Sequence, residues 1–187
     1  MGTKQESPYE VLDNTFRVAL VGESGVGKTT IAKKFTEDVT DEQRRYYTRC
    51  VQLGERIIQV QFLDMKYKGN QERFLFDCFC KPQQGAVIVF DASCYNAAKD
   101  AQTWLQSILS MSDAYELILI GNKSDLKGNN GEVNSKMKNF ANANRIPLYY
   151  TSAISDESIE IALFALLKQM AKKVPSRQQA NSNCSIA

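Results

Sequence analysis

The sequence contains no histidine among its 187 residues. This absence excludes imidazole as a general base, as the activator of a nucleophile or as a metal ligand, and so removes the commonest hydrolase arrangements. The cysteines contain no CxxC pair and, without histidine, cannot easily complete a zinc site. They lie at positions 50, 78, 80, 94 and 184. We therefore expect a reduced, cytoplasmic protein whose chemistry uses other groups.

Long apolar runs and a strong net charge are also missing. No apolar stretch approaches the roughly 20 residues needed to span a bilayer, and the N-terminus has no charged leader followed by an apolar run. The 23 Lys and Arg residues nearly balance the 21 Asp and Glu residues, which gives a net charge of +2. This balance offers no case for a nucleic-acid partner. The chain is long enough for one globular domain with a real core.

Hydrophobic periodicity predicts strands that alternate with helices. Compact apolar runs predict strands at 16–21, 85–91, 115–120 and 148–151, and a hairpin at 46–53 and 56–63. Apolar residues at helical spacing predict helices that start near positions 28, 97, 133 and 155. This order predicts an α/β fold with a doubly wound, mainly parallel sheet and one antiparallel hairpin. We expect a flexible segment at 1–14, a single domain at 15–173 and a flexible tail at 174–187.

One glycine-rich motif is typical of phosphate binding. Residues 22–29 read GESGVGKT, which matches GxxxxGK[ST] and lies between an apolar strand and a helix start. Glycines let backbone N–H groups turn inward around phosphates, Lys28 would reach the terminal phosphates, and the Thr29 hydroxyl would ligate Mg²⁺. An ordinary glycine turn is the alternative. The predicted nucleotide contacts here are Gly22, Glu23, Ser24, Gly25, Val26, Gly27, Lys28, Thr29 and Thr30.

A second motif, NKSD at 122–125, selects the base. A carboxylate only accepts hydrogen bonds, so Asp125 suits guanine, which presents N1–H and an exocyclic amine, whereas adenine would present an acceptor. Lys123 can lay its aliphatic stem along the base plane, and Asn122 can tie this loop to the phosphate loop. Alone, NKSD would often be a polar turn. About 100 residues after a phosphate loop, it predicts binding of GDP or GTP.

These motifs occur in the order found in Ras-like small GTPases, which are P-loop NTPases. The resemblance rests on GESGVGKT, Asp64, QERF at 71–74, NKSD and Thr151-Ser152-Ala153, and it covers about residues 15–173. Ser24, QERF and Trp104-Leu105 look most like the Rab branch. The resemblance implies that Asp64 holds Mg²⁺ through water and that Ser152 and Ala153 offer backbone to the guanine. Ile154, the next residue of that site, stands where the family commonly has lysine.

The two switch regions depart from the family pattern. The family has DTAGQE after its third strand, whereas Asp64 is followed here by MKYKGNQE. Gln71 is the candidate for orienting the attacking water, and a solvated loop glutamine is the alternative. The first switch is short. Thr40 is the candidate Mg²⁺ ligand and Thr48 the alternative, although either could be a plain surface or strand threonine.

The chain ends in Cys184-Ser185-Ile186-Ala187, which fits a C-a-a-X prenylation motif. Nearby positive charge comes from Lys168, Lys172, Lys173 and Arg177. One lipid and a basic patch together support reversible attachment to the cytosolic face of an anionic membrane. An accidental cysteine in a tail is the alternative. Rab proteins often end in paired cysteines, so this tail departs from that branch.

Together these features predict a membrane-attached molecular switch, active in signalling or vesicle trafficking. It would bind GTP, GDP and Mg²⁺, hydrolyse GTP slowly, act as a monomer and bind effector and regulatory proteins. A constitutive guanine-nucleotide-binding scaffold with little or no hydrolysis is the second hypothesis, and both altered switches favour it. A P-loop ATPase or small-molecule kinase is the third, and NKSD argues against it.

Overall fold

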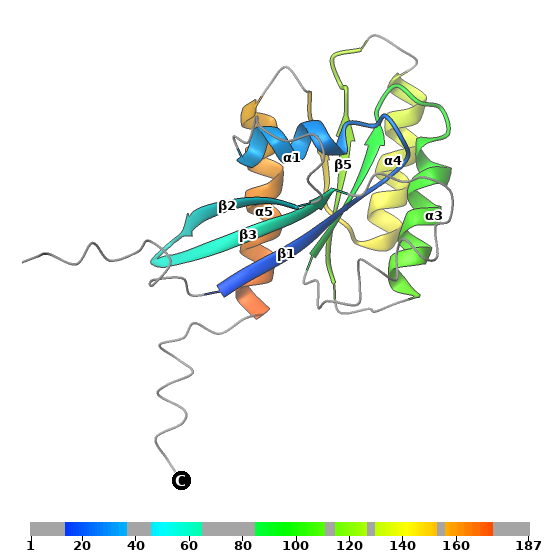
Figure 1. The fold of residues 1–187 in the computed structure, drawn as a ribbon. Helices are drawn as coiled ribbons and strands as arrows, with labels where there is room; N and C mark the ends of the chain where they lie inside the picture. The colour runs from blue at the N-terminus through cyan, green and yellow to red at the C-terminus, as the bar shows by residue number, and fades with distance from the viewer. Residues whose placement is uncertain are drawn as a thin grey trace, which may run out of the picture.

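The computed structural model describes residues 14–36, 46–64, 85–110, 115–126, 130–152 and 156–173. Strands and helices alternate along the chain (Figure 1). The strands are β1 (Asn14–Val21), β2 (Tyr46–Leu53), β3 (Arg56–Asp64), β4 (Gly85–Asp91), β5 (Glu116–Asn122) and β6 (Leu148–Tyr150). The helices are α1 (Lys28–Thr36), α3 (Ala97–Leu109), α4 (Asn130–Asn144) and α5 (Asp156–Lys173).

The strands form one sheet in the order β2-β3-β1-β4-β5-β6. The β2–β3 hairpin pairs antiparallel, and the other neighbouring strands pair parallel. The predicted fold class, a doubly wound and mainly parallel sheet with one hairpin, is therefore confirmed. Elements differ from the prediction mainly at their ends, because β5 continues through Asn122 and α4 begins at Asn130.

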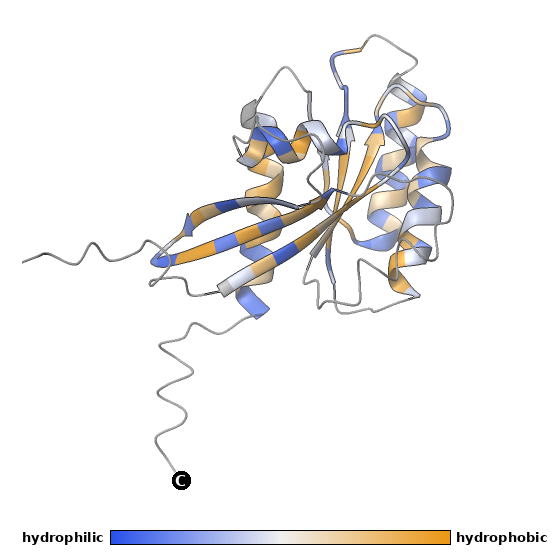
Figure 2. Ribbon diagram, in the orientation of Figure 1, coloured by the Kyte–Doolittle hydropathy of each residue, from blue (hydrophilic) through white to orange (hydrophobic). Residues whose placement is uncertain are grey.

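Helices cover both faces of the sheet, which explains the hydropathy of its central strands. Six of the seven residues of β4 are buried, whereas buried and exposed residues alternate along much of the edge strand β2. In Figure 2 the central strands are mostly orange and the helices carry blue residues on their outer sides. One core cluster joins α1 and α5 to the sheet, and a second joins α3 and α4 to the opposite face.

Helix α5 confirms the periodicity seen in the sequence. Its five predicted core residues are at most 1% exposed. They are Ile159, Ala162, Leu163, Leu166 and Met170. This apolar stripe packs against the sheet, while Lys172 and Lys173 lie in the last turn, where positive charge favours the helix dipole. No described helix is both long and apolar enough to cross a membrane.

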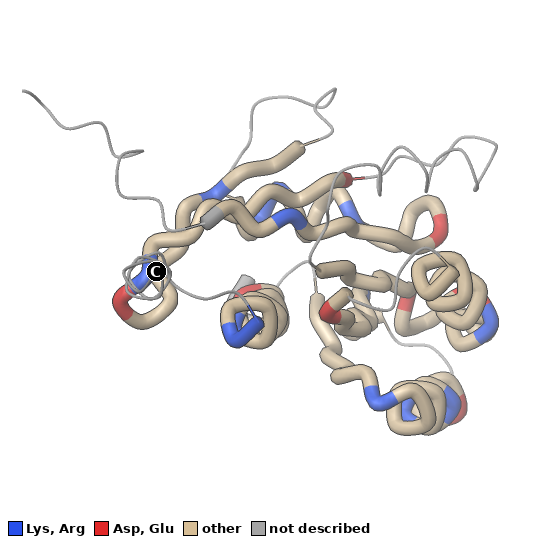
Figure 3. The backbone as a smooth tube through the Cα atoms, turned by 90° about the horizontal axis from the view of Figure 1, so that it is seen from below, with Lys and Arg blue, Asp and Glu red and all other residues tan. Residues whose placement is uncertain are grey.

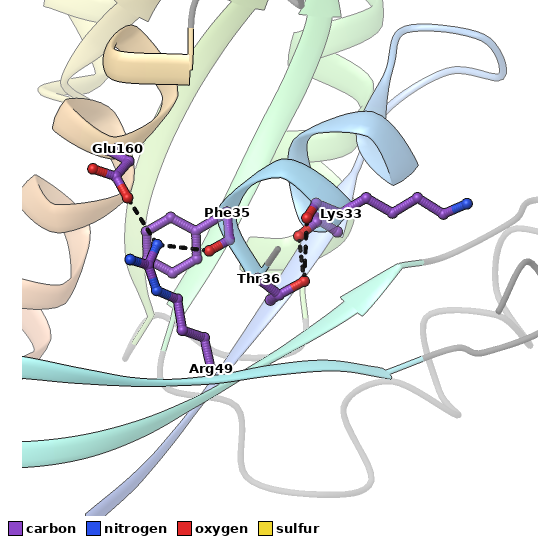
Figure 4. Close-up of polar contacts among 6 residues, drawn as sticks. Lys33, Phe35, Thr36, Arg49 and Glu160 are labelled. Carbon is purple, nitrogen blue, oxygen red and sulfur yellow. Dashed lines mark hydrogen bonds and ion pairs between the residues drawn. The ribbon is translucent and has the colours of Figure 1, made fainter. Parts of the chain in front are cut away.

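Arg49 of β2 joins α1 to α5 (Figure 4). Its Nη1 donates to the Phe35 carbonyl oxygen in the last turn of α1 and to Glu160 Oε1 of α5, both at 2.7 Å. The guanidinium also lies 4.9 Å from the centroid of the Phe35 ring. Arg49 therefore takes part in packing α1 against α5 and is more than a solvated surface charge. Arg49 thus ties the last turn of α1 to α5.

Charged side chains are spread over the described surface. Figure 3 shows lysine and arginine positions interspersed with aspartate and glutamate positions along the described backbone. Several opposite charges are paired, for example Lys136 with Glu132 and Lys173 with Glu116.

Candidate nucleotide-binding site

The phosphate loop connects the end of β1 to the start of α1, as the sequence predicts. It needs glycine at two positions for steric reasons. Gly22 and Gly27 have φ angles of 141° and 100°, a region that other residues rarely adopt. A Cβ on Gly22 would lie 2.0 Å from the Val89 carbonyl oxygen, and one on Gly27 would lie 2.1 Å from Asn122 Nδ2. The loop is thus packed against β4 and β5 at the carboxyl ends of the parallel strands.

Lys28 is held on the inner side of this loop. Its side chain is 7% exposed, and its Nζ donates to the carbonyl oxygens of Gly22 and Glu23, both at 2.7 Å. Burial lowers the pKa of the Lys28 ammonium, and the negative charges of Asp64 and Glu23 oppose that shift. An ammonium has three donors, so a phosphate oxygen could accept the third hydrogen bond and offset the cost of burying the charge.

Thr29 and Asp64 provide oxygen ligands suited to Mg²⁺. Thr29 Oγ1 donates to Asp64 Oδ2 at 2.5 Å, although the two residues lie on α1 and at the end of β3. Asp64 is 2% exposed, and its Oδ1 is buried without a hydrogen-bond partner in the described structure. A buried carboxylate oxygen without a partner is costly, so a hydrated cation fits this position. Among the described residues no cluster of three or more acidic or thiol side chains could hold a metal. Phosphate oxygens and water are further oxygen ligands that Mg²⁺ commonly takes at nucleotide sites.

Asn122 ties the NKSD loop to the phosphate loop, as predicted. It is 1% exposed, its Nδ2 donates to the Val26 carbonyl oxygen at 2.9 Å, and its Oδ1 accepts a bond from Thr151 Oγ1 at 3.3 Å. Backbone bonds reinforce this contact, because Thr151 N–H donates to Gly121 and Ser124 N–H donates to Thr151. Three loops that are remote in sequence are therefore held in one arrangement.

Asp125 lies exposed beside Ser152. The Ser152 hydroxyl donates to Asp125 Oδ1 at 2.5 Å, which orients a carboxylate that can otherwise accept from a ligand. The prediction that these two residues belong to one site is consistent with their contact. Thr30, in contrast, is exposed on α1 and none of the described contacts joins it to the loops.

Asp91, at the end of β4, was missed by the sequence reasoning. Its Oδ2 pairs with Lys123 Nζ at 2.7 Å, and its Oδ1 accepts bonds from the backbone N–H and hydroxyl of Ser93. Burial acts to raise the pKa of Asp91, but the hydrogen bonds from Lys123 and Ser93 outweigh it and lower the pKa. The feature of the sequence that could have identified Asp91 is a carboxylate at the end of a buried strand. Asp91 faces Asn122 in the β4–β5 register, so it lies beside the NKSD loop.

Several predicted residues fall outside the described part of the chain. These are Thr40, Gln71, Ala153, Ile154 and Cys184. Thr48 lies within β2 opposite Gln61 of β3, as expected for a strand threonine.

A phosphate loop, an acidic and hydroxyl pair suited to Mg²⁺, and an NKSD loop tied to the phosphate loop define a guanine-nucleotide-binding P-loop protein. The comparisons with known proteins agree with this class. The model of the Ras family matches residues 17–172, and the chain belongs to this family of small GTPases.

Three Rab proteins illustrate the similarity. The chain is 30% identical to Ras-related protein Rab-25 of Bos taurus over 97% of this chain and 87% of the relative. It is 31% identical to the Rab-25 of Canis lupus familiaris and 30% identical to that of Homo sapiens, each over 97% of this chain and 86% of the relative. The expected position close to the Rab branch is thus confirmed, and guanine nucleotide with Mg²⁺ is the ligand set typical of the family.

Proposed function

We propose that this protein is a guanine-nucleotide-dependent switch with slow GTP hydrolysis, attached to a membrane in signalling or vesicle trafficking. The Asn122–Val26 hydrogen bond carries the nucleotide-binding part of the proposal. It joins the loop that would read the base to the loop that would hold the phosphates, so one ligand can engage both ends at once. Monomeric action and recognition of GTP-ordered loops by effectors belong to the same proposal.

Nucleotide and Mg²⁺ would be held by residues with distinct roles. Lys28 and the phosphate-loop N–H groups would neutralise and orient the phosphates. Thr29 and Asp64 would hold Mg²⁺, which supplies charge stabilisation for phosphoryl transfer when it is bound. Asp125 would accept hydrogen bonds from guanine and thereby exclude adenine. Thr40 remains the proposed further metal ligand, and Ala153 and Ile154 remain proposed neighbours of the base.

Hydrolysis is expected to be slow for a physical reason. Intrinsic rates in such proteins are on the order of 10⁻⁴ to 10⁻² s⁻¹ unless an arginine stabilises the developing charge. Arg49 is engaged by Phe35 and Glu160 and is no candidate for that role. We expect an activating protein to supply additional positive charge. Gln71 is the proposed residue that orients the attacking water.

A second candidate function is a constitutive guanine-nucleotide-binding scaffold. The sequence from Asp64 onward, DMKYKGNQE in place of the family's DTAGQE, favours it. The altered spacing would place Gln71 out of phase with the reacting phosphate. Nucleotide would then be bound with the same loops, but binding of GTP would cause no cycle of closure and hydrolysis.

Single-turnover hydrolysis distinguishes the two candidates. The purified chain is first analysed for bound nucleotide by chromatography, then loaded with GTP and followed for phosphate release. The switch proposal predicts bound GDP or GTP and a slow rate that falls at least about tenfold in Gln71→Ala, because the water loses its orienting group. Gln83→Ala in the same experiment is the control with an unchanged rate. Bound guanine nucleotide without phosphate release would establish the scaffold, and absence of guanine nucleotide would overturn both.

Membrane attachment is proposed to depend on Cys184. In prenylating cells, Cys184→Ser should move most of the protein from the membrane fraction to the supernatant, because basic residues alone bind anionic lipid weakly. Intact mass spectrometry should show the farnesyl addition in the parent chain and its loss in the variant. Ser182→Ala is a matched change two residues away that should leave both readouts unaltered. An unmodified Cys184 in the parent chain would contradict this part of the proposal.

A further inference from the structure

Glu23 places a carboxylate on the phosphate loop itself. Its backbone carbonyl oxygen accepts the 2.7 Å bond from Lys28 Nζ, so this residue forms part of the phosphate-binding turn. Its side chain turns toward α3, where Oε1 accepts a 3.1 Å hydrogen bond from Trp104 Nε1. Trp104 is 2% exposed and belongs to the core cluster between the sheet and α3. The loop and the helix are 81 positions apart in sequence, and this bond joins them directly.

The position of this carboxylate matters because its charge has the same sign as a phosphate. Unlike a neutral residue, Glu23 would repel the nucleotide if its side chain swung toward the phosphates. A cavity of about 230 Å³ lies beside the bond and is lined by Glu23, Trp104 and Asp100, so the side chain is not locked by close packing on every side. A specific hydrogen bond is therefore needed to define which way the carboxylate points.

The other charged groups at this cavity make that hydrogen bond more important. Asp100 of α3 lies on the same cavity, and burial together with the charge of Glu23 raises the pKa of Asp100, while Lys99 opposes the shift. The Glu23 carboxylate thus experiences repulsion from the helix side as well. Lys123 also lines the cavity but is paired with Asp91, which reduces its attraction for Glu23. The Trp104 indole N–H offsets the repulsion on the α3 side.

We propose that Trp104 is a positioning residue for nucleotide binding: its indole N–H holds the Glu23 carboxylate against α3 and away from the phosphates. Nucleotide affinity then depends on Trp104 of α3, a residue that lies outside both nucleotide-binding motifs. This inference rests on the proposed guanine-nucleotide binding. It predicts that loss of Trp104 weakens nucleotide binding mainly because the charged Glu23 side chain is then free to approach the phosphates. Loss of packing around Trp104 should have a smaller effect on nucleotide binding.

Suppression by a second substitution tests this mechanism. Trp104→Phe keeps an aromatic ring but removes the donor, and it should speed dissociation of GDP by about tenfold, equivalent to about 1.4 kcal/mol. Glu23→Gln keeps an acceptor for Trp104 without the charge, and its own GDP release rate is the reference for the double variant. The double variant Glu23→Gln, Trp104→Phe should release GDP at about the rate of Glu23→Gln alone, because an uncharged side chain does not repel the phosphates.

Two further variants separate this role from a structural one. Ile108→Val removes a methyl from the same core cluster, one turn farther along α3, and should lower the denaturation midpoint without changing GDP release. Glu23→Asp leaves Trp104 intact but shortens the acidic side chain, so it should reproduce the defect even if Trp104→Phe folds poorly. GDP release that is clearly faster in the double variant than in Glu23→Gln, or parent-like GDP release by both Trp104→Phe and Glu23→Asp, would overturn the inference. A parent chain that binds no GDP would instead overturn the proposed function.

Discussion

Replacing Asp125 by asparagine is expected to weaken GDP binding by roughly 100- to 1,000-fold. The carboxylate can accept bonds from both guanine N1–H and the exocyclic amine, whereas an amide offers one acceptor oxygen and turns an NH₂ group toward a donor. The Ser152 hydroxyl, which donates to Asp125 Oδ1, can still donate to the amide oxygen, so the loop itself should keep its geometry. The loss would therefore be specific to the base.

The same variant should gain affinity for a nucleotide with a different base. Xanthine carries a carbonyl oxygen where guanine carries the exocyclic amine, so the asparagine NH₂ can donate to it. Xanthosine diphosphate should bind the Asp125→Asn variant more tightly than GDP, with the preference reversed in the parent chain, as measured by competition against a fluorescent nucleotide. Ser124→Ala in the same turn is the control and should change either affinity by no more than about twofold. Undiminished GDP binding by Asp125→Asn would show that Asp125 does not read the base.

Replacing Gly27 by alanine should remove nucleotide binding, with a loss of affinity of at least about 100-fold, and destabilise the fold by roughly 1 to 3 kcal/mol. The new Cβ would lie 2.1 Å from Asn122 Nδ2, and the residue would have to keep a φ of 100°. Relief of this clash requires movement of the phosphate loop or of the Asn122 side chain. Either movement breaks the link between the two nucleotide-binding loops.

Urea unfolding and nucleotide titration measure the two effects separately. Gly131→Ala is a suitable control, because Gly131 lies in α4, a Cβ added there would meet no described atom within 4 Å, and alanine favours the helix. This control should keep parent-like affinity and gain slightly in stability. Parent-like nucleotide binding by Gly27→Ala would contradict the view that close approach of Asn122 assembles the site.

Much of the candidate site is readable in the sequence because its motifs are local. The phosphate loop needs a strand, a glycine turn and a helix start in immediate succession, and all three are visible in residues 16–35. Strands such as β4 and β5 are continuous apolar runs because helices cover both faces of the sheet. The contact between Asn122 and the phosphate loop was also predictable, because the carboxyl ends of parallel strands meet at one edge.

Other contacts depend on how helices and strands pack against one another. The hydrophobic periodicity of the sequence does not specify this packing. A helical pattern identifies which face of α3 is buried, but it does not reveal that Trp104 lies opposite Glu23. The pairing of Lys123 with Asp91 depends on the register of β4 against β5. Arg49 reads as an exposed charge until β2, α1 and α5 are placed together.

The sequence by itself determined the fold class, the family and the two nucleotide-binding motifs, because each of these is specified by residues close together in the chain. The tertiary structure alone decided which side chains hold those motifs in place. Hydrogen bonds such as Trp104–Glu23 and Arg49–Glu160 join residues 81 and 111 positions apart, and their distances are set by the packing of whole helices on the sheet. A small displacement of a helix on the sheet is enough to break such a hydrogen bond. These contacts therefore follow from the assembled core rather than from any local pattern.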